Sequence, residues 1–319
     1  MASRPRIVVT RKLPEAVEAR LADSFEAVLN PEDAPMPPDA LAQAMREADG
    51  LLCAVVDAVD AAVIGTPGRR AGIVANFGVG VNNIDLAAAK AAGVVVTNTP
   101  DVLTDATADL AIALLLAATR RMSETERILR AGGWDGFRPT GWLGMGLQGK
   151  TLGIVGMGRI GQATARRAQA AFGMRIVYHN RSAVGPFDFP AEARPSVEAV
   201  LAEADVVTLH VPGGGGVLMT AERLAAMKPG AYLVNTARGD IVDEPALAAA
   251  LASGRLAGAG LDVFAEEPKV PEALLELPNV TLLPHIGSAT VETRTAMGML
   301  AVDNLAAYFA GEPLPSRVA

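Results

Sequence analysis

Three short motifs in this sequence combine side chains that could do acid–base and electrostatic chemistry. Each follows an apolar run that is typical of a strand: Asn235-Thr236-Ala237-Arg238-Gly239, Leu261-Asp262-Val263-Phe264-Ala265-Glu266-Glu267-Pro268 and Leu283-Pro284-His285-Ile286-Gly287. Ligands of open α/β sheets bind outside the carboxyl ends of the strands, so we expect the three motifs to meet at one site. Arg238, Glu267 and His285 are the candidate catalytic residues.

These residue types suit the reduction of a carbonyl group by a nicotinamide cofactor. Such a reaction needs an acid that protonates the oxygen as hydride arrives, and a cation that orients the substrate. His285 can be the acid and Arg238 the cation, while Glu267 can hold the imidazole in place and keep it protonated near neutrality. Taken singly, a histidine at a strand end is more often structural, and Glu266-Glu267 can be a solvated turn. The placement of all three residues after strands favours a catalytic role over a structural one.

A glycine-rich motif, Gly156-Met157-Gly158-Arg159-Ile160-Gly161, lies directly between an apolar strand and a helix. In this context Gly156 permits the tight turn, Gly158 lets the backbone approach a pyrophosphate, and Gly161 allows the helix to pack closely on the strand. The first turn of the helix adds free N–H groups and a positive dipole. The motif therefore predicts dinucleotide binding rather than a merely structural turn.

The end of the following strand indicates which dinucleotide is preferred. About twenty residues after the glycine motif an acidic residue would bind the ribose hydroxyls of NAD, but the chain reads Asn180-Arg181-Ser182 there. Arg181 and Ser182 offer a charged fork and a hydroxyl to a 2′-phosphate. We expect NADP(H) to be preferred, with NAD(H) as the alternative if Arg181 is only a solvated residue at a strand end.

The elements that must position these residues are short apolar strands alternating with alanine-rich helices. Strands are expected at 7–10, 26–29, 50–55, 73–76 and 94–98, and then at 151–155, 175–179, 206–210, 231–235, 259–263 and 281–283. Helices are expected at 15–24, 86–92, 160–171, 245–253 and 291–309. Strands that are apolar throughout indicate parallel sheets covered on both faces, so the chain is expected to form two doubly wound α/β domains.

The boundary between the two domains is expected at Thr99-Pro100, because proline cannot extend a strand and biases its predecessor away from helix. A long apolar helix is expected over 106–130, followed by an irregular, glycine-rich connection over 132–149. The last helix has no strand after it and is expected to pack on the first domain. The first domain then comprises 1–99 and 290–319, and the dinucleotide-binding domain comprises 100–289.

Composition narrows the class of partner. The 319-residue chain is 50% hydrophobic and carries a net charge of −7 without any cluster of Lys or Arg, which argues against nucleic acid and membrane surfaces. Its longest apolar run, 110–118, is short of the ~20 residues of a membrane span. A soluble, cytoplasmic protein with a small-molecule partner is expected. The single cysteine, Cys53, is expected to be a buried structural residue, and no metal site is expected.

Taken together, these residues resemble the D-2-hydroxyacid dehydrogenases, and within them the glyoxylate/hydroxypyruvate reductases, also called D-glycerate dehydrogenases. The resemblance covers nearly the whole chain. It is carried by the 29- and 18-residue spacings between Arg238, Glu267 and His285, by the glycine motif, by Arg181-Ser182, and by the stretches 76–85 and 97–105. The family implies a flavodoxin-like substrate domain and a Rossmann cofactor domain. It also implies NADPH-dependent reduction of glyoxylate to glycolate and of hydroxypyruvate to D-glycerate, and homodimers formed through the cofactor domains.

The resemblance also implies roles by position. Arg238 would bind the substrate's carboxylate and keto oxygen, His285 would be the acid–base, and Glu267 would support it. Backbone N–H groups of Val79 and Gly80 would hold the carboxylate from the first domain. The implied cofactor contacts are Arg159 and Ile160 with the pyrophosphate, Asp262 with the nicotinamide carboxamide, Pro212 and Ala237 along the groove, and Thr104.

One segment departs from the family. After Pro212 the relatives' loop is longer and carries an acidic or Thr-containing turn, whereas this chain has four glycines, Gly213 to Gly216, which lower the order of the loop. Trp142 is the candidate for an aromatic residue that reaches the partner's active site in some relatives. Two alternatives stay open: a dehydrogenase for another acid, such as a 2-ketogluconate reductase or a phosphoglycerate dehydrogenase, and a dinucleotide-sensing protein similar to transcriptional corepressors.

Overall fold

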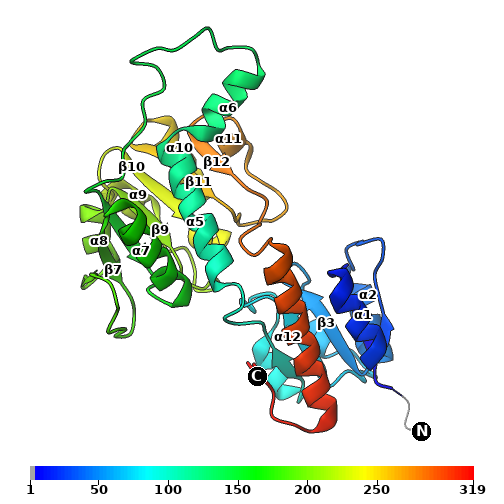
Figure 1. The fold of residues 1–319 in the computed structure, drawn as a ribbon. Helices are drawn as coiled ribbons and strands as arrows, with labels where there is room; N and C mark the ends of the chain where they lie inside the picture. The colour runs from blue at the N-terminus through cyan, green and yellow to red at the C-terminus, as the bar shows by residue number, and fades with distance from the viewer. Residues whose placement is uncertain (1–3) are drawn as a thin grey trace. The chain divides into compact units, whose positions relative to one another are not determined.

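The computed structural model describes residues 4–319, which divide into two compact units (Figure 1). Unit 1 runs to Leu103 and resumes at Ser288–Ala319, and unit 2 comprises Thr104–Gly287. The sequence predicts separate domains at 1–99 with 290–319 and at 100–289, and their independence as folding domains stays a prediction.

Unit 1 is built on a five-stranded parallel sheet. Its strands are β1 (Arg6–Val9), β2 (Glu26–Val28), β3 (Gly50–Ala54), β4 (Ile73–Phe77) and β5 (Val95–Thr97), in the spatial order β2-β1-β3-β4-β5. Its helices are α1 (Glu15–Ser24), α2 (Pro38–Glu47), α3 (Ala61–Ile64), α4 (Leu86–Ala91) and α12 (Val291–Ala310). This strand order is that of flavodoxin-like folds, as the resemblance implies.

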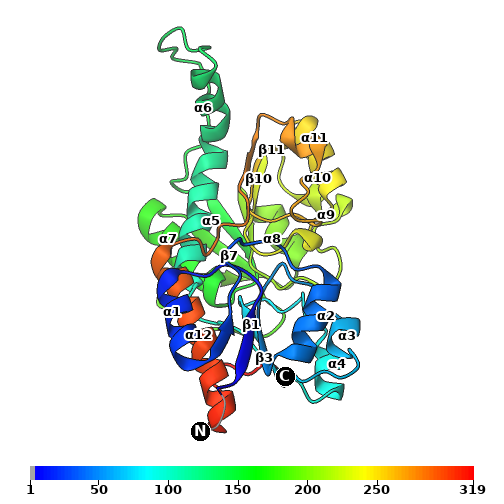
Figure 2. The ribbon, with the colours of Figure 1, turned by 90° about the vertical axis from the view of Figure 1, so that its right-hand side faces the viewer.

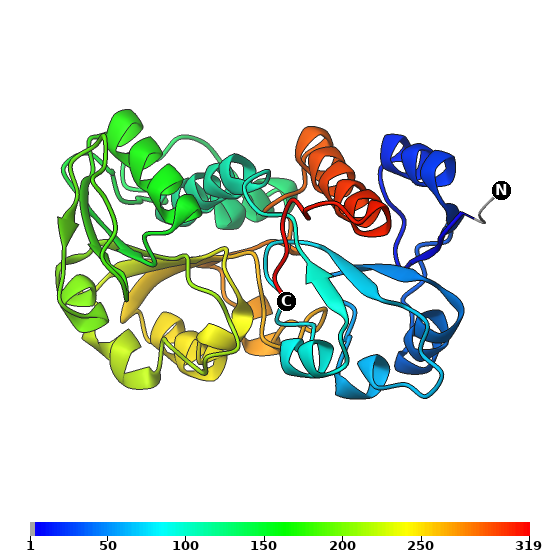
Figure 3. The same ribbon diagram turned by 90° about the horizontal axis from the view of Figure 1, so that it is seen from below.

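Two hydrophobic clusters, one on each face of this sheet, form the core of unit 1. Val17 of α1 and Leu305 of α12 belong to the cluster on one face, and Met45 of α2 and Ile64 of α3 belong to the cluster on the other (Figure 3). The last helix therefore packs on the first unit, as the sequence predicts. Cys53 of β3 is fully buried, as the sequence predicts, and burial raises the pKa of its thiol well above the ordinary value.

Unit 2 is built on a seven-stranded parallel sheet. Its strands are β6 (Thr151–Val155), β7 (Arg175–His179), β8 (Glu192–Ala193), β9 (Val206–Leu209), β10 (Ala231–Asn235), β11 (Leu256–Leu261) and β12 (Val280–Leu282), in the order β12-β11-β10-β9-β6-β7-β8. Its helices are α5 (Thr104–Thr119), α6 (Met122–Arg130), α7 (Arg159–Phe172), α8 (Val197–Glu203), α9 (Ala221–Ala226), α10 (Glu244–Ala252) and α11 (Glu272–Leu275), with a 3₁₀ turn η1 (Gly239–Ile241).

The strand order of unit 2 is that of a Rossmann fold with one added strand. Along the chain, β7 and β8 are added on one side of β6, and β9 to β12 are then added on its other side. The strand order therefore reverses between β6 and β9, and the crevice at their carboxyl ends is the topological switch point where dinucleotides bind. Helices α5 and α7 cover one face of the sheet, and α8, α9 and α10 cover the other (Figure 3).

Two expectations about elements are wrong. The single helix expected over 106–130 is two helices, because Arg121 adopts a left-handed conformation, φ +55°, between α5 and α6. Its guanidinium donates to both carboxylate oxygens of Glu124, at 2.8 and 2.7 Å, and so fixes the first turn of α6. Strand β8 was not expected, because its two exposed residues carry no apolar pattern.

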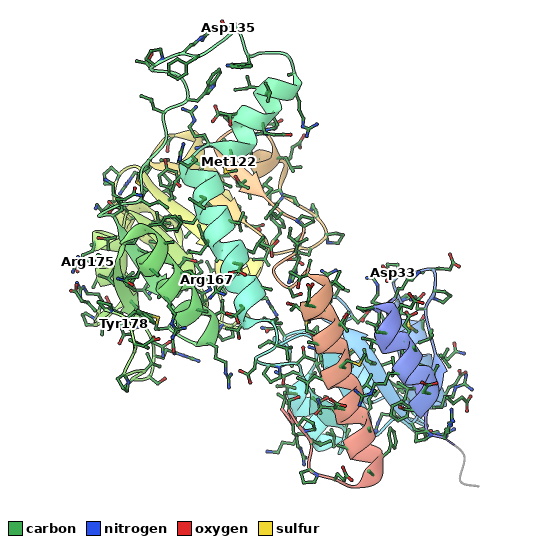
Figure 4. The ribbon with its side chains drawn as sticks, in the orientation of Figure 1. Asp33, Met122, Asp135, Arg167, Arg175 and Tyr178 are labelled. Carbon is green, nitrogen blue, oxygen red and sulfur yellow. The ribbon has the colours of Figure 1, made fainter. Side chains whose placement is uncertain are left out.

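Helix α6 and the segment 131–149 after it extend away from the sheet of unit 2 (Figures 1 and 2). We call this part of the chain the arm. Figure 4 shows Met122 at the start of α6 and Asp135 at the far end of the arm. Large apolar side chains of the arm face solvent, including Trp134, which is 58% exposed, and Phe137, which is 88% exposed.

Candidate active site

The three candidate catalytic residues follow neighbouring strands of unit 2. Arg238 follows β10, Glu267 follows β11 and His285 follows β12. Asn235 at the end of β10 pairs with Leu261 at the end of β11, which pairs with Leu282 at the end of β12, so the strand ends are level. The structure therefore brings the three loops to one edge of the sheet, as the sequence predicts.

His285 and Glu267 form a hydrogen-bonded pair. His285 Nδ1 lies 2.7 Å from Glu267 Oε2, and Glu267 Oε1 accepts the N–H of Phe264 at 3.0 Å. Burial alone would raise the pKa of Glu267, but the hydrogen bond from His285, the N–H of Phe264 and the charge of Arg238 bring this pKa below its ordinary value. Glu267 is therefore a carboxylate near neutrality and accepts a proton-bearing Nδ1, which leaves Nε2 of His285 for a ligand.

Asp262 fixes the backbone that carries His285. His285 itself has a left-handed backbone, φ +54°, which is uncommon for a residue with a side chain. Its N–H donates to the carbonyl of Asp262 at 2.9 Å, and the two carboxylate oxygens of Asp262 accept the N–H groups of Ile286 and Gly287 at 2.7 and 2.8 Å. Asp262 is buried, and its burial raises its pKa against the effect of these hydrogen bonds. Its predicted contact with the nicotinamide carboxamide stays a prediction.

Arg238 keeps most of its hydrogen-bonding capacity uncommitted. Its Nη1 donates to the carbonyl of Ala237 at 2.6 Å, and within residues 4–319 no acceptor lies in hydrogen-bonding geometry to its Nε or Nη2. Burial lowers the pKa of the guanidinium, and the negative charges of Glu267 and Asp240 oppose that effect. An arginine remains protonated at neutral pH despite such a shift, so Arg238 offers a charged, planar fork to an anion.

Three further residues that the sequence reasoning assigned no role hold the loops of this site. The buried side chain of Asn235 donates to the carbonyl of Arg238 at 2.7 Å and accepts the N–H of Ala237 at 3.0 Å. Glu244 accepts the N–H of Ala265 at 2.9 Å and thereby supports the Glu267 loop. Gly239 packs so tightly on the backbone at Phe264 that a Cβ would overlap it. A buried polar residue at a strand end is the one sequence signal that points to Asn235.

The glycine motif has the geometry that dinucleotide binding requires. Gly156 has φ +97°, a conformation that side chains disfavour, and a Cβ at this position or at Gly161 would overlap neighbouring backbone. Gly158 precedes α7, which begins at Arg159, and has open space where a Cβ would lie. No side chain caps this 14-residue helix, so the N–H groups of its first turn, Ile160 included, suit a pyrophosphate.

The carboxyl end of β7 carries an amide and a guanidinium rather than a carboxylate. Asn180 Oδ1 accepts the N–H of Met157 at 3.0 Å, and Asn180 Nδ2 donates to the carbonyl of Ser182 at 2.9 Å. Asn180 therefore ties the strand end to the glycine motif. Arg181 and Ser182 are exposed, as a contact with a 2′-phosphate would require.

The remaining predicted cofactor residues belong to unit 2 and lie at or beside the ends of its elements. Thr104 is the first residue of α5, Pro212 is exposed after β9, and Ala237 is half-buried beside Arg238. The four-glycine loop is tethered by one hydrogen bond, from the N–H of Gly214 to Asp240 Oδ2 at 2.5 Å. Trp142 is half-buried in the arm. The cofactor roles of Thr104, Pro212 and Ala237 stay predictions.

Val79 and Gly80 belong to unit 1, in the loop that follows β4. Across the part of the chain that the structure describes, the N–H groups of these two residues have no protein acceptor. They are therefore suited to an anionic ligand, although their predicted contact with a substrate carboxylate stays a prediction.

A Rossmann unit with this glycine motif and an Arg, Glu and His set at its sheet edge defines a nicotinamide-dependent oxidoreductase. The family model described as "D-isomer specific 2-hydroxyacid dehydrogenase, NAD binding domain" matches residues 112–287. The chain is 46% identical to a glyoxylate reductase of Thermococcus kodakarensis, over 99% of this chain and 96% of the relative. The chain belongs to the D-isomer specific 2-hydroxyacid dehydrogenase family.

Two solved structures are similar over nearly their whole length. A putative D-isomer specific 2-hydroxyacid dehydrogenase from Polaromonas sp. JS6 66 has a TM-score of 0.92 and 38% identity, with 99% of this chain and 100% of that chain covered. An NADPH-dependent glyoxylate/hydroxypyruvate reductase from Sinorhizobium meliloti, in complex with NADP and malonate, has a TM-score of 0.88 and 42% identity, with 99% and 97% covered. The fold predicted from the sequence, with its two doubly wound parallel sheets, is confirmed.

Proposed function

We propose that this enzyme reduces short 2-keto acids, glyoxylate and hydroxypyruvate, with NADPH as the preferred cofactor. The observation that carries the proposal is the His285–Glu267 pair at 2.7 Å on the sheet edge that also carries Arg238. Relatives named glyoxylate reductase at about 45% identity support the choice of substrate. The S. meliloti structure with bound NADP supports the choice of cofactor.

The residues fit a bound dinucleotide. The open space beside Gly158 and the uncapped start of α7 suit a pyrophosphate, while Arg181 and Ser182 are available to a 2′-phosphate. We infer that Arg159, Ile160, Pro212, Ala237, Asp262 and Thr104 complete the cofactor site. When bound, the reduced cofactor supplies a hydride to the carbonyl carbon of the substrate.

The protein's part in the reaction is to bind the keto acid and supply one proton. Arg238 binds the carboxylate and the keto oxygen, and backbone N–H groups of Val79 and Gly80 bind the carboxylate. His285 transfers the proton on Nε2 to the carbonyl oxygen, so the C=O bond becomes a C–OH bond as the carbon gains its hydrogen. The carboxylate of Glu267 stabilises the imidazolium before transfer and orients the neutral ring afterwards.

Replacing His285 tests this proposal. His285→Ala should lower kcat for glyoxylate and hydroxypyruvate by roughly 10²-fold or more, which is the usual contribution of a positioned acid. The dissociation constant of NADPH, measured by fluorescence titration, should change little. Initial rates of the unaltered protein with NADPH and NADH should be measured on a panel that includes larger 2-keto acids.

Three results would count against the proposal. Near-normal turnover of His285→Ala would remove His285 from the mechanism. Selective reduction of a larger acid would favour a different dehydrogenase of the family, such as a 2-ketogluconate reductase. A protein that binds NADPH but reduces no acid would favour the dinucleotide-sensing alternative.

The proposal extends to assembly and location. We infer a homodimer in which the arms of two copies cover each other's apolar side chains, because Trp134, Phe137 and Leu143 are exposed together on the arm. Through residues 4–319, every helix falls short of the length or apolar character that crossing a membrane demands. A cytoplasmic location is proposed from composition alone.

A further inference from the structure

The loop of residues 78–83, which follows β4 in unit 1, contains a run of unpaired backbone donors. For the residues that the structure describes, the N–H groups of residues 79–83 make no hydrogen bond to protein. Consecutive N–H groups that point toward one place form an anion-binding concavity. Whether these groups can act together depends on what fixes their orientation.

Three successive carbonyls of this loop are held by donors from the surrounding protein. The carbonyl of Gly78 accepts the N–H of Thr99 at 3.0 Å. The carbonyl of Val79 accepts Asn98 Nδ2 at 2.9 Å, and that of Gly80 accepts Asn76 Nδ2 at 2.8 Å. In a planar trans peptide the C=O of one residue points opposite to the N–H of the next. These bonds therefore also orient the N–H groups of residues 79, 80 and 81.

Asn76 is itself held rigidly. It is fully buried in β4, and its Oδ1 accepts Asn83 Nδ2 at 3.2 Å and faces the thiol of Cys53 at 3.5 Å. Asn83 Nδ2 also donates to the carbonyl of Ala54 at 3.1 Å, which ties the far end of the loop to the end of β3. A buried amide with partners on both its oxygen and its nitrogen has one low-energy orientation.

We propose that Asn76 and Asn98 are positioning residues, which hold the N–H groups of Val79, Gly80 and Val81 in the orientation that binds the substrate's carboxylate. This inference rests on the proposed function, in which Val79 and Gly80 bind that carboxylate. It adds Val81 as a third donor and assigns the orientation of all three to two side-chain amides. In this role each amide acts through a carbonyl of the loop and needs no contact with the substrate.

The test compares Asn98→Ala and Asn76→Ser with the unaltered enzyme, all as full chains saturated with cofactor. Loss of one orienting hydrogen bond should raise the KM for glyoxylate by about tenfold. The dissociation constant of oxalate, a small dicarboxylate probe measured by calorimetry, should rise by a similar factor. The KM for NADPH should stay within about twofold, because the glycine motif is untouched.

A matched control separates positioning from general loss of stability. Asn30 is another loop-tethering amide of unit 1, whose Nδ2 donates to the carbonyls of Thr10 and Ala34 at 2.7 and 2.8 Å. Asn30→Ala should lower the melting temperature without changing the KM for glyoxylate or the dissociation constant of oxalate. If Asn76→Ser fails to fold, Asn98→Ala still tests the positioning role. Asn98 is only half-buried, so we expect its replacement to leave the fold intact.

Unchanged oxalate binding in a folded Asn98→Ala, or an equal loss in Asn30→Ala, would overturn the positioning role. An unaltered enzyme that does not bind oxalate would overturn it too. An unaltered enzyme that binds oxalate but reduces no 2-keto acid would instead contradict the proposed function, and the oxalate constants of the variants would still test the positioning role.

Discussion

At the scale of single residues, the sequence predicts the candidate catalytic side chains better than it predicts the hydrogen bonds that hold their loops in place. Arg238, Glu267 and His285 are recognisable from their types and their places after strands. The hydrogen bonds of Asn235, Asp262 and Asn76 are not, because each involves backbone groups that only the folded loops and strands bring within reach. A buried amide or carboxylate has the same sequence signature whether it binds a ligand or a loop.

Cofactor choice is a residue-scale prediction at the end of β7. Arg181→Gln removes the charged fork and leaves the Asn180 contacts with Met157 and Ser182 in place. Because a charge-assisted hydrogen bond contributes roughly 1.5–3 kcal/mol, kcat/KM with NADPH should fall by about one to two powers of ten, mainly through KM, while kcat/KM with NADH should change little. Steady-state rates with both cofactors measure the ratio.

The same strand supplies the control for this prediction. Arg175 begins β7, at the end of the strand opposite to Arg181 (Figure 4). It is exposed like Arg181, but it forms ion pairs with Glu192 and Glu203. Arg175→Gln should leave the cofactor ratio unchanged. If Arg181→Gln keeps the ratio of kcat/KM with NADPH to kcat/KM with NADH of the unaltered protein, Arg181 does not bind the 2′-phosphate.

At the scale of elements, strands are predicted from the sequence more closely than helix breaks. The strands β6, β7 and β10 begin and end where the apolar runs predict, because burial on both faces requires apolar residues throughout. The break between α5 and α6 depends on one left-handed residue, Arg121, and its contact with Glu124. The periodic pattern of apolar residues carries no information about such a contact, so the helix break cannot be predicted from it.

The end of β9 gives the fold a pH-dependent stability. Burial of His210 lowers the pKa of its imidazole to about 4. An unfolded chain takes up this proton near the ordinary histidine pKa of ~6.5, so acid favours unfolding as the pH falls from ~6.5 toward about 4. His210→Asn lacks this titration and should lose about 1–2 kcal/mol less stability than the unaltered protein between pH 7 and pH 5.

Urea unfolding at the two pH values measures this difference. A carboxylate with a lowered pKa, such as Glu267, contributes little between these two pH values, because it stays ionised in the folded protein at pH 5. The prediction concerns only the difference between the two proteins. Parallel stability curves for both proteins would show that His210 is not kept neutral by the fold.

At the scale of the whole molecule, the proposed homodimer has its interface on the arm. Phe137→Ser combined with Leu143→Ser removes two exposed apolar side chains of the arm and should shift the molecular mass in light scattering from dimer toward monomer. Val56→Ser combined with Val291→Ser changes two exposed apolar residues of unit 1 and should leave the mass unchanged. A monomeric unaltered protein, or equal effects of both pairs, would rule out the arm as the interface.

The return of the last helix to unit 1 has a consequence for synthesis on the ribosome. Residues 104–287 form unit 2 as one continuous stretch, whereas unit 1 takes residues from both sides of it. The face of the first sheet on which α1 packs lacks its second helix, α12, until Leu305 has been translated. Nascent chains therefore expose the part of this apolar face that α12 will cover while the whole of unit 2 is being made, and chaperones can bind it during that interval.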